Sequence, residues 1–304
     1  MEVILAQPRG FCAGVVRAIE IVERALKVHG PPVFVLHEIV HNRHVVQELI
    51  EKGAVFVEAL EGLSQGAVTI FSAHGVSPAV VEEARKRGLR IIDATCPLVT
   101  KVHLEAQRYS RQGFEVIIIG HPGHSEVEGT RGWVEGPVHV VSTASEVDDL
   151  RVRRPDRLAY VTQTTLSIDD TKNVIAALKR RFPVRGPGLS DICYATQSRQ
   201  NAVRHLAGIV DLLLVVGARN SSNSNRLREV GEQSGLRAYL IEDEEELQPA
   251  WFSEDSRVGV TAGTSAPETV IQRVLERLRA YGAKSIREME GKQEELRFRL
   301  PENL

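Results

Sequence analysis

Short runs of aliphatic and β-branched residues alternate with amphipathic stretches along almost the whole chain. The apolar runs have the length of strands. The stretches between them repeat apolar residues every three or four positions, as one face of a helix does. This alternation predicts α/β units with parallel sheets. The expected strands include residues 33–36, 68–71, 90–92, 115–119, 158–161, 211–216 and 257–260, and the expected helices include 15–28, 79–87, 99–111, 198–206 and 267–281.

The three cysteines all fall between an expected strand and an expected helix. Cys12 follows VILA, Cys96 follows RIIDA and Cys193 follows GLSDI, and an amphipathic stretch comes directly after each. Parallel α/β sheets bind their ligands at such strand-to-helix loops. The partial positive charge of a helix N-terminus also favours the thiolate, which is the form that binds metal.

The spacing of these loops repeats three times. Cys12 and Cys96 are 84 residues apart, Cys96 and Cys193 are 97 apart, and a polar loop follows the cysteines by 29, 28 and 28 residues. We therefore predict three similar α/β domains with mainly parallel sheets, arranged around a pseudo-threefold axis with the cysteines at the centre. The expected ranges are 13–96, 97–193 and 194–283, followed by a C-terminal tail at 284–304.

The third range lacks a strand that leads into a cysteine. We expect the N-terminal strand, within residues 1–12, to join this domain and to deliver Cys12. Pairing of residues 2–6 with the first domain alone would contradict this. The tail is interpreted as a strand that docks on the body of the protein and carries no chemistry.

Composition excludes several classes of function. The formal net charge of −2 gives no basic excess for nucleic acid. No apolar run approaches the ~20 residues that span a bilayer. Glu2 stands where a signal peptide would be positive, so we expect a cytoplasmic protein. In that reducing compartment, cysteines are expected to be buried, catalytic or metal-binding.

Three cysteines far apart in sequence favour an iron–sulfur cluster over zinc. Zinc sites usually contain local pairs such as C-x-x-C, and this sequence has none. A four-iron cluster fits a ring of three cysteines that leaves the fourth iron open. Zinc held by the thiolates and one histidine stays an alternative, as do three unrelated buried thiols.

The remaining loops supply donors suited to an anionic substrate. Hydroxyl, amide and imidazole groups could together hold a diphosphate, although the sequence has no Walker loop. These groups belong to Ser221, Ser222, Asn223, His41, His74 and His124. Glu126, beside the glycines of the His124 loop, is the expected proton donor.

Each of these residues also has a simpler interpretation. Ser222 and Thr165 are of the types that cap helices, a loop histidine is often structural, and Glu126 could be an ordinary first-turn acid. The acidic run at 242–249 is interpreted as a solvated loop and helix start. Two other classes stay open: a zinc hydrolase or lyase that uses the same loops, and a non-catalytic cluster-bearing sensor. The sensor would lack the diphosphate donors.

Eight motifs occur in an order that resembles a known family. They are GFCAGVVRAI, HEIVHN, AHGVSP, DATCPLVTKVH, GHPGHSEVEGT, TQTTLS, NSSNSNRL and TAGTSAPE, and they span residues 1 to about 281. In these motifs the chain is similar to the 4-hydroxy-3-methylbut-2-enyl diphosphate reductase (IspH, LytB) family. The resemblance implies an oxidoreductase that removes an allylic hydroxyl and yields isopentenyl and dimethylallyl diphosphate. That reaction is the last step of the non-mevalonate isoprenoid pathway.

The resemblance also implies roles for individual residues. One [4Fe–4S] cluster per chain would have Cys12, Cys96 and Cys193 as ligands and its fourth iron open. Glu126 would relay protons, and Thr165 would help to place the substrate hydroxyl. Electrons would come from an external donor, since the sequence has no G-x-G-x-x-G fingerprint, and the resemblance implies that this donor is ferredoxin or flavodoxin. The diphosphate would be held by His41, His74, His124, Ser221, Ser222, Asn223 and Ser265.

Overall fold

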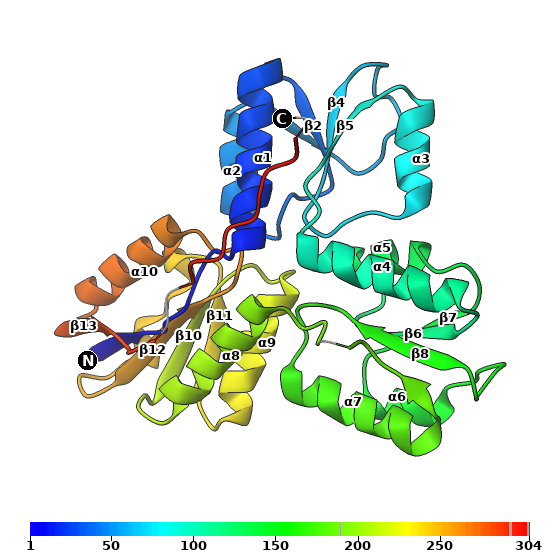
Figure 1. The fold of residues 1–304 in the computed structure, drawn as a ribbon. Helices are drawn as coiled ribbons and strands as arrows, with labels where there is room; N and C mark the ends of the chain where they lie inside the picture. Colours follow the sequence, from blue (N-terminus) through cyan, green and yellow to red (C-terminus); the bar gives the residue numbers. More distant parts are fainter. Residues whose placement is uncertain (189, 292–293, 303) are drawn as a thin grey trace. The chain divides into compact units, whose positions relative to one another are not determined.

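Parallel strands organise the protein in this computed structural model, which describes residues 1–304 except 189, 292–293 and 303 (Figure 1). The described strands form three sheets. The chain divides into two compact units: unit 1 is Met1–Val15, His41–Val45 and Tyr194–Leu296, and unit 2 is Val16–Val40, Val46–Cys193 and Arg297–Leu304. The predicted α/β class with parallel sheets is confirmed. The domain boundaries and the pseudo-threefold arrangement stay predictions.

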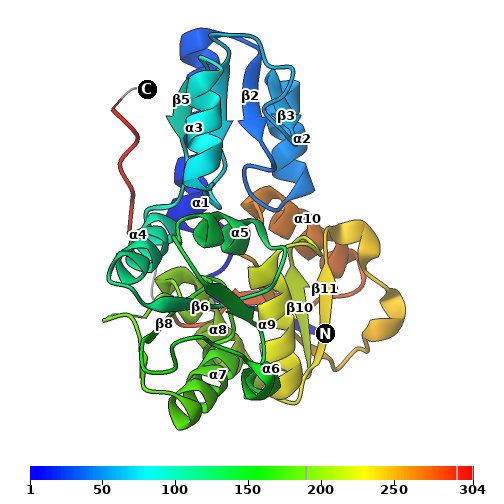
Figure 2. The same ribbon diagram turned by 90° about the vertical axis from the view of Figure 1, so that its right-hand side faces the viewer.

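The first sheet of unit 2 has the strand order β3-β2-β4-β5. Its strands are β2 (Val33–Leu36), β3 (Ala54–Val57), β4 (Val68–Phe71) and β5 (Arg90–Asp93). Helices α1 (Ala13–His29) and α2 (Arg43–Glu51) lie on one face, and α3 (Pro78–Lys86) lies on the other (Figures 1 and 2). Because helices cover both faces, β4 is buried at every position and its VTIF sequence shows no alternation.

The second sheet of unit 2 has the order β7-β6-β8-β9. Its strands are β6 (Glu115–Ile119), β7 (Val138–Val141), β8 (Leu158–Thr162) and β9 (Val184–Arg185). Its helices are α4 (Pro97–Arg111), α5 (Ser125–Gly132), α6 (Ala144–Asp149) and α7 (Ile168–Arg181). Residues of α4 and α5 share one core cluster with the sheet, and residues of α6 and α7 share another. The central strands β6 and β8 are buried throughout.

The sheet of unit 1 has the order β11-β10-β12-β1-β13. Its strands are β1 (Glu2–Leu5), β10 (Leu212–Val216), β11 (Arg237–Ile241), β12 (Arg257–Ala262) and β13 (Ser285–Glu288). The elements around it are α8 (Tyr194–Ala207), α9 (Ser222–Gln233), α10 (Glu268–Ala280) and the 3₁₀ turns η1 (Glu244–Glu246) and η2 (Pro249–Trp251). Helices α8 and α9 pack on one face and α10 packs on the other.

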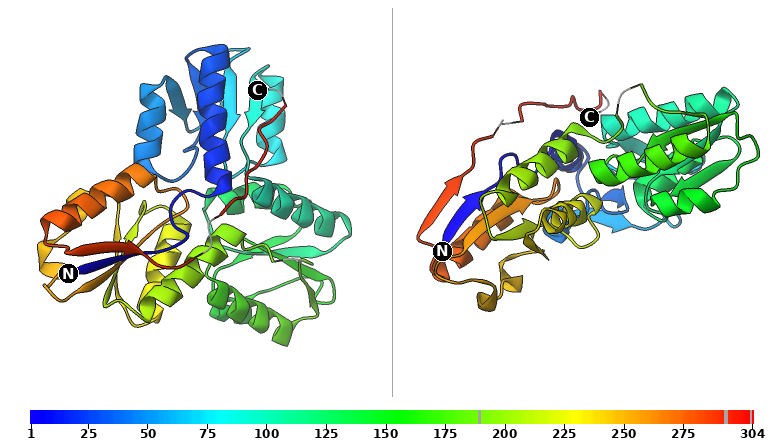
Figure 3. Two further views of the ribbon diagram at one scale, coloured as in Figure 1. Left: turned by 60° about the vertical axis from the view of Figure 1, so that its left-hand side comes forward. Right: turned by 90° about the horizontal axis from the view of Figure 1, so that it is seen from below.

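The N-terminal strand joins the sheet formed by the last third of the chain. In β1, Leu5 pairs with Val260 of β12 on one side and with Glu288 of β13 on the other. Figure 3 shows the blue β1 beside the red strand of the C-terminal tail. The N-terminal strand therefore joins the sheet that the sequence analysis expected, and a strand of the tail, for which no place was predicted, pairs with it.

The segment before Cys193 departs from the predicted pattern. No strand leads directly into this cysteine within the described residues, because β9 already ends at Arg185. Gly186, Pro187 and Gly188 follow. Proline has no N–H for the ladder and glycine has no side chain to pack, so a strand does not continue here.

Across the described residues of the chain, no helix is both long enough and apolar enough to cross a membrane.

Candidate active site

Glu126 is buried at the carboxyl ends of two neighbouring strands of unit 2. It lies in the first turn of α5, which follows β6, and it is 2% exposed. The backbone N–H of Thr164 donates to Oε1 of Glu126 at 2.6 Å, and the Thr164 hydroxyl donates to Oε2 at 3.0 Å. Thr164 follows β8, the partner of β6 in the sheet. Strand pairing therefore fixes the carboxyl group and both of its donors.

Burial makes Glu126 an acid suited to neutral pH. It raises the pKa of the carboxyl to about 7; the two hydrogen bonds from Thr164 oppose this, and the charge of Asp191 adds to it. A group whose pKa lies near the working pH can both hold and release a proton, as a general acid must. A raised pKa at the carboxyl ends of parallel strands favours a functional role for Glu126 over the role of an ordinary first-turn acid.

Two imidazoles lie in the loops beside this carboxyl group. The rings of His74 and His124 are 5.9 Å apart between centroids and nearly perpendicular. Nδ1 of His124 accepts the backbone N–H of Glu126 at 3.1 Å and so caps α5. That contact assigns the proton of a neutral His124 to Nε2, which is then a hydrogen-bond donor. Nδ1 of His74 lies 3.4 Å from the hydroxyl of Ser72.

Cys96 and Cys193 are anchored through their backbones in the same unit. The N–H of Cys96 donates to the carbonyl of Ala73 at 3.0 Å, and the N–H of Cys193 donates to the carbonyl of Thr164 at 3.1 Å. Both thiol side chains are partly buried. Cys193 is therefore tied to the residue that holds the buried carboxyl group, and Cys96 is tied to the residue before His74.

Asp191 holds the irregular segment that leads to Cys193. Its Oδ2 accepts the N–H of Thr162 at 3.0 Å, and its Oδ1 accepts from Nζ of Lys101 at 3.1 Å. Burial raises the pKa of Asp191, while Thr162 and Lys101 oppose that rise. The sequence analysis missed Asp191, because a single acid two residues before a cysteine is a weak signal.

Thr165 has a different partner from its neighbour Thr164. Nε2 of Gln163 donates to the Thr165 hydroxyl at 3.0 Å, and Oε1 of Gln163 accepts the N–H of His121 at 3.1 Å. The threonine in contact with Glu126 is thus Thr164, which the sequence analysis did not single out although it belongs to the TQTTLS motif. The predicted role of Thr165 stays a prediction.

In unit 1, Cys12 lies between β1 and α1. Its N–H donates to the carbonyl of Thr264 at 3.2 Å. Burial raises the pKa of the Cys12 thiol; the N–H of Val15 and the charge of Arg199 oppose that rise. The start of the helix does favour the thiolate, as expected, but burial outweighs it. Metal binding to such a thiol is coupled to the loss of its proton.

Asn223, in the first turn of α9, has a buried amide that no group of the described residues satisfies. It is 2% exposed, and among the described residues neither Nδ2 nor Oδ1 has a hydrogen-bond partner. An unsatisfied buried polar group costs about 1–3 kcal/mol. A residue that keeps such a group is therefore a candidate for ligand binding. The residue that caps α9 is Ser221, whose hydroxyl accepts the N–H of Ser224 at 3.3 Å, and not Ser222, for which the sequence analysis gave the capping interpretation.

Two glycines let the start of α9 approach the strand ends closely. A Cβ atom at Gly217, after β10, or at Gly263, after β12, would lie 2.1 Å from the hydroxyl oxygen of Ser224. At Gly263 it would also lie 3.5 Å from Nδ2 of Asn223. The first turn of α9, with its partial positive charge, is thereby fixed beside the carboxyl edge of the sheet.

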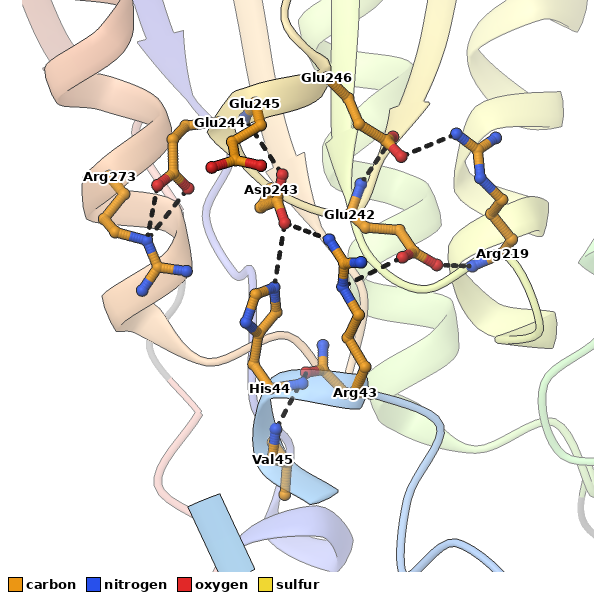
Figure 4. A network of polar contacts seen from close by, with 11 residues as sticks. Arg43, His44, Val45, Arg219, Glu242, Asp243, Glu244, Glu245, Glu246 and Arg273 are labelled. Carbon is orange, nitrogen blue, oxygen red and sulfur yellow. Dashed lines mark hydrogen bonds and ion pairs between the residues drawn. The ribbon is translucent and has the colours of Figure 1, made fainter. Parts of the chain in front are cut away.

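His41 is held in unit 1, although the chain on both sides of residues 41–45 belongs to unit 2. The hydroxyl of Ser265 donates to the carbonyl of His41 at 2.9 Å. Arg43 forms an ion pair with Asp243, and Nε2 of His44 lies 3.4 Å from the same carboxylate (Figure 4). Asp243 is 5% exposed. The interpretation of the acidic run as solvated is wrong for Asp243, because its charge is buried against these partners.

The predicted site residues thus fall into two groups. Unit 2 carries Cys96, Cys193, His74, His124, Glu126 and Thr165, and unit 1 carries Cys12, His41, Ser221, Ser222, Asn223 and Ser265. In the described ranges, no three His, Cys, Asp or Glu side chains are grouped so as to hold a metal ion. The three cysteines divide between the two units, so their joint use as ligands stays a prediction.

Comparison with known sequences gives one consistent result. Residues 3–279 match the model of the family described as LytB protein. The chain is 56% identical to the 4-hydroxy-3-methylbut-2-enyl diphosphate reductase of Pseudomonas putida strain GB-1, over 100% of this chain and 98% of that protein. It is 54% identical to the enzyme of the same name from Acinetobacter baumannii strain ATCC 17978, with the same coverage.

Solved structures agree with the sequence matches. The E-1-hydroxy-2-methyl-but-2-enyl-4-diphosphate reductase of Plasmodium falciparum superposes with a TM-score of 0.93 at 37% identity, covering 99% of this chain and 96% of that chain. A structure of (E)-4-hydroxy-3-methyl-but-2-enyl diphosphate reductase, described as the terminal enzyme of the non-mevalonate pathway, gives a TM-score of 0.66 at 35% identity. It covers 92% of this chain and 100% of that chain.

Proposed function

This chain belongs to the LytB family of 4-hydroxy-3-methylbut-2-enyl diphosphate reductases, and on that premise we propose that Glu126 protonates the substrate hydroxyl that leaves as water. The reaction is a reduction: two electrons and two protons convert the allylic alcohol to isopentenyl or dimethylallyl diphosphate and water. The observation that carries the proposal is the buried carboxyl group, whose pKa is about 7 and which Thr164 holds through two hydrogen bonds.

The three cysteines are proposed to hold one [4Fe–4S] cluster whose fourth iron is open. The donor chemistry fits, because thiolates are the usual ligands of such clusters. Cys12, Cys96 and Cys193 each directly precede or cap a helix, and each has its N–H bound to a carbonyl of a strand-end loop. When bound, the cluster supplies single electrons and a Lewis-acidic iron. An external donor, ferredoxin or flavodoxin, would deliver the electrons.

The diphosphate is proposed to bind at the start of α9 and to the imidazoles. The unsatisfied amide of Asn223 supports this, because an anionic oxygen would accept from its Nδ2. Nε2 of His124 adds a donor from unit 2. The other proposed contacts are His41, His74, Ser221, Ser222 and Ser265. Thr165 is proposed to help to place the substrate hydroxyl.

Turnover of an anaerobically purified enzyme tests the function directly. The protein, with its cluster reconstituted and a chemical reductant present, should convert 4-hydroxy-3-methylbut-2-enyl diphosphate to the two isoprenyl diphosphates, detected by mass spectrometry. Absence of product from a protein with full iron and sulfide content would contradict the proposal.

Replacing Asn223 should weaken substrate binding without weakening the fold. Asn223→Leu is expected to raise KM by about 10–100-fold and to change kcat little, because a hydrogen bond to a charged group contributes about 1.5–3 kcal/mol. Since the amide has no partner within the described residues, the melting temperature of the cluster-free protein should not fall. Steady-state kinetics and calorimetry provide both measurements.

Asn225 is the matched control for this variant. Its Nδ2 donates to the carbonyl groups of Arg219 at 2.8 Å and Ser221 at 2.9 Å. Asn225→Leu is therefore expected to lower the melting temperature and to leave KM nearly unchanged. The reverse pattern in the two variants would exclude Asn223 from the diphosphate site.

The pH dependence of catalysis should report the protonation of Glu126. An essential acid is active when protonated, so kcat/KM is expected to stay level below pH 7 and to fall tenfold per unit above about pH 7. The hydroxyl of Thr164 lowers the pKa of Glu126, so Thr164→Val should move this fall to higher pH. If kcat/KM of Thr164→Val falls at the same pH as in the wild type, the titrating group is not Glu126 but another one, such as a phosphate of the substrate.

A further inference from the structure

The C-terminal tail carries a carboxylate that binds a fully buried arginine of unit 1. Oε1 and Oε2 of Glu294 lie 3.0 Å and 2.9 Å from Nη1 and Nη2 of Arg199, a two-pronged ion pair. The hydroxyl of Ser198 also donates to Oε1 of Glu294, at 2.7 Å. The side chain of Arg199 is 0% exposed and that of Glu294 is 18% exposed.

The remaining donors of Arg199 bind the loop that carries Cys12. Nε and Nη2 both donate to the carbonyl of Gly10, at 3.1 Å and 2.8 Å, and Nη2 also lies 3.3 Å from the carbonyl of Phe11. Nη1 donates to the carbonyl of Ala195, one turn back in α8. The guanidinium is thus shared between its own helix, the tail and the two residues before Cys12.

The loop before Cys12 has a backbone conformation at Gly10 that most residues do not adopt easily. Gly10 has a φ of +66°, and a Cβ atom there would lie 3.3 Å from the carbonyl oxygen of Ala266. A loop that turns so tightly next to a proposed ligand needs its carbonyl groups satisfied in one geometry. Arg199 provides donors for two consecutive carbonyl groups, those of Gly10 and Phe11.

Arg199 can donate to these two carbonyl groups from a buried position only if its positive charge is balanced. A cation buried without a counter-charge is strongly unfavourable, and removing one member of a buried ion pair leaves the other uncompensated. Glu294 supplies the negative charge with the planar, two-oxygen geometry that suits a guanidinium. The position of the Cys12 loop therefore depends on a residue more than 280 positions away in sequence.

We propose that Glu294 is a positioning residue: through Arg199 it fixes the loop of Cys12, and the C-terminal tail thereby fastens this proposed cluster ligand. The inference rests on the proposed function only in treating Cys12 as a cluster ligand. The dependence of the loop on Glu294 can be measured without any cluster.

The test is the alkylation rate of each cysteine in the cluster-free protein, followed by peptide mass spectrometry with iodoacetamide. In Glu294→Gln, Cys12 should react faster, on the order of tenfold, because local opening exposes it more often. Cys96 and Cys193 serve as internal references and should keep their rates. Glu295→Gln, which changes an exposed neighbour in the tail, should leave all three rates unchanged.

A second variant guards against a folding failure of the first. Ser198→Ala removes the contact of the Ser198 hydroxyl with Glu294, together with its longer contact with the Ala195 carbonyl at 3.3 Å, and keeps the charge of Glu294. It should raise the rate of Cys12 by a smaller factor. An unchanged rate of Cys12 in both variants, or an equal rise for all three cysteines, would overturn the proposal.

A measurement on the cluster-loaded protein separates this proposal from the proposed function. Iron release to a chelator should be faster in Glu294→Gln than in the wild type. Suppose that Cys12 is alkylated faster in the cluster-free variant, that the variant releases iron no faster than the wild type, and that a bound cluster does not protect Cys12 from alkylation. Then the tail positions the loop, but Cys12 is not a ligand.

Discussion

Glu126→Gln is expected to lower the rate of reduction by about 10²–10⁴-fold, which is the usual contribution of a positioned general acid. Glutamine has the same shape and keeps an oxygen that can accept the N–H of Thr164, so the strand ends should not rearrange. It cannot supply a proton, so the hydroxyl would have to leave without help. The measurement is a single-turnover assay under a chemical reductant, together with the dissociation constant of the substrate, which should change little.

Glu128→Gln is the control for this substitution. Glu128 lies in the same first turn of α5, but its side chain is 47% exposed and pairs with Arg131 at 3.8 Å. Its removal should alter the rate by less than about threefold, as is usual for an exposed side chain outside a binding site. Equal rates for Glu126→Gln and the wild type would show that the proton comes from elsewhere.

Alanine at any one of Cys12, Cys96 and Cys193 is expected to abolish turnover and to prevent formation of a stable four-iron cluster. Each substitution removes one of the three protein ligands proposed for the cluster. The measurement is iron and sulfide per chain after anaerobic reconstitution, with the absorbance of the cluster and the activity of the same sample. The three variants act as controls for one another, because ligands of one cluster must give the same result.

Two outcomes would contradict the shared cluster. A variant that keeps full iron and sulfide content would show that its cysteine is an unrelated buried thiol. A wild-type protein that binds zinc and no sulfide, and stays colourless, would favour the zinc alternative instead. Both outcomes can be read before any kinetic measurement.

The sheets could be predicted from sequence because their signals are local. The strand at residues 115–119 consists of Glu115 and four β-branched apolar residues followed by a glycine-containing loop, and its bounds coincide with those of β6. The helix after Cys96 begins with proline, which is favoured in the first turn, so its start is also encoded locally. Ligand loops at strand ends follow from the same pattern, and this is why Glu126 and His124 could be selected as candidates.

The interactions that hold the site together could not be predicted in this way. The carboxylate of Asp243 reads as one acid in an exposed run, and only the fold brings Arg43, 200 residues earlier, against it. Glu294 and Arg199 are 95 residues apart and belong to no periodic pattern. A choice between Thr164 and Thr165 depends on which side chain points at Glu126, and adjacent positions in a motif do not reveal this.

The position of β1 between β12 and β13 has a consequence for how the protein is made. The first strand to leave the ribosome pairs with strands that are synthesised more than 250 residues later. Closing so long a loop is slow compared with forming neighbouring pairs, so β1 has to wait for its partners. A nascent chain that ends before residue 257 offers β1 neither of them. The loop of Cys12 can therefore reach its native position only after translation is nearly complete, so the cluster that we propose Cys12 to hold would be inserted at the end of synthesis or after it.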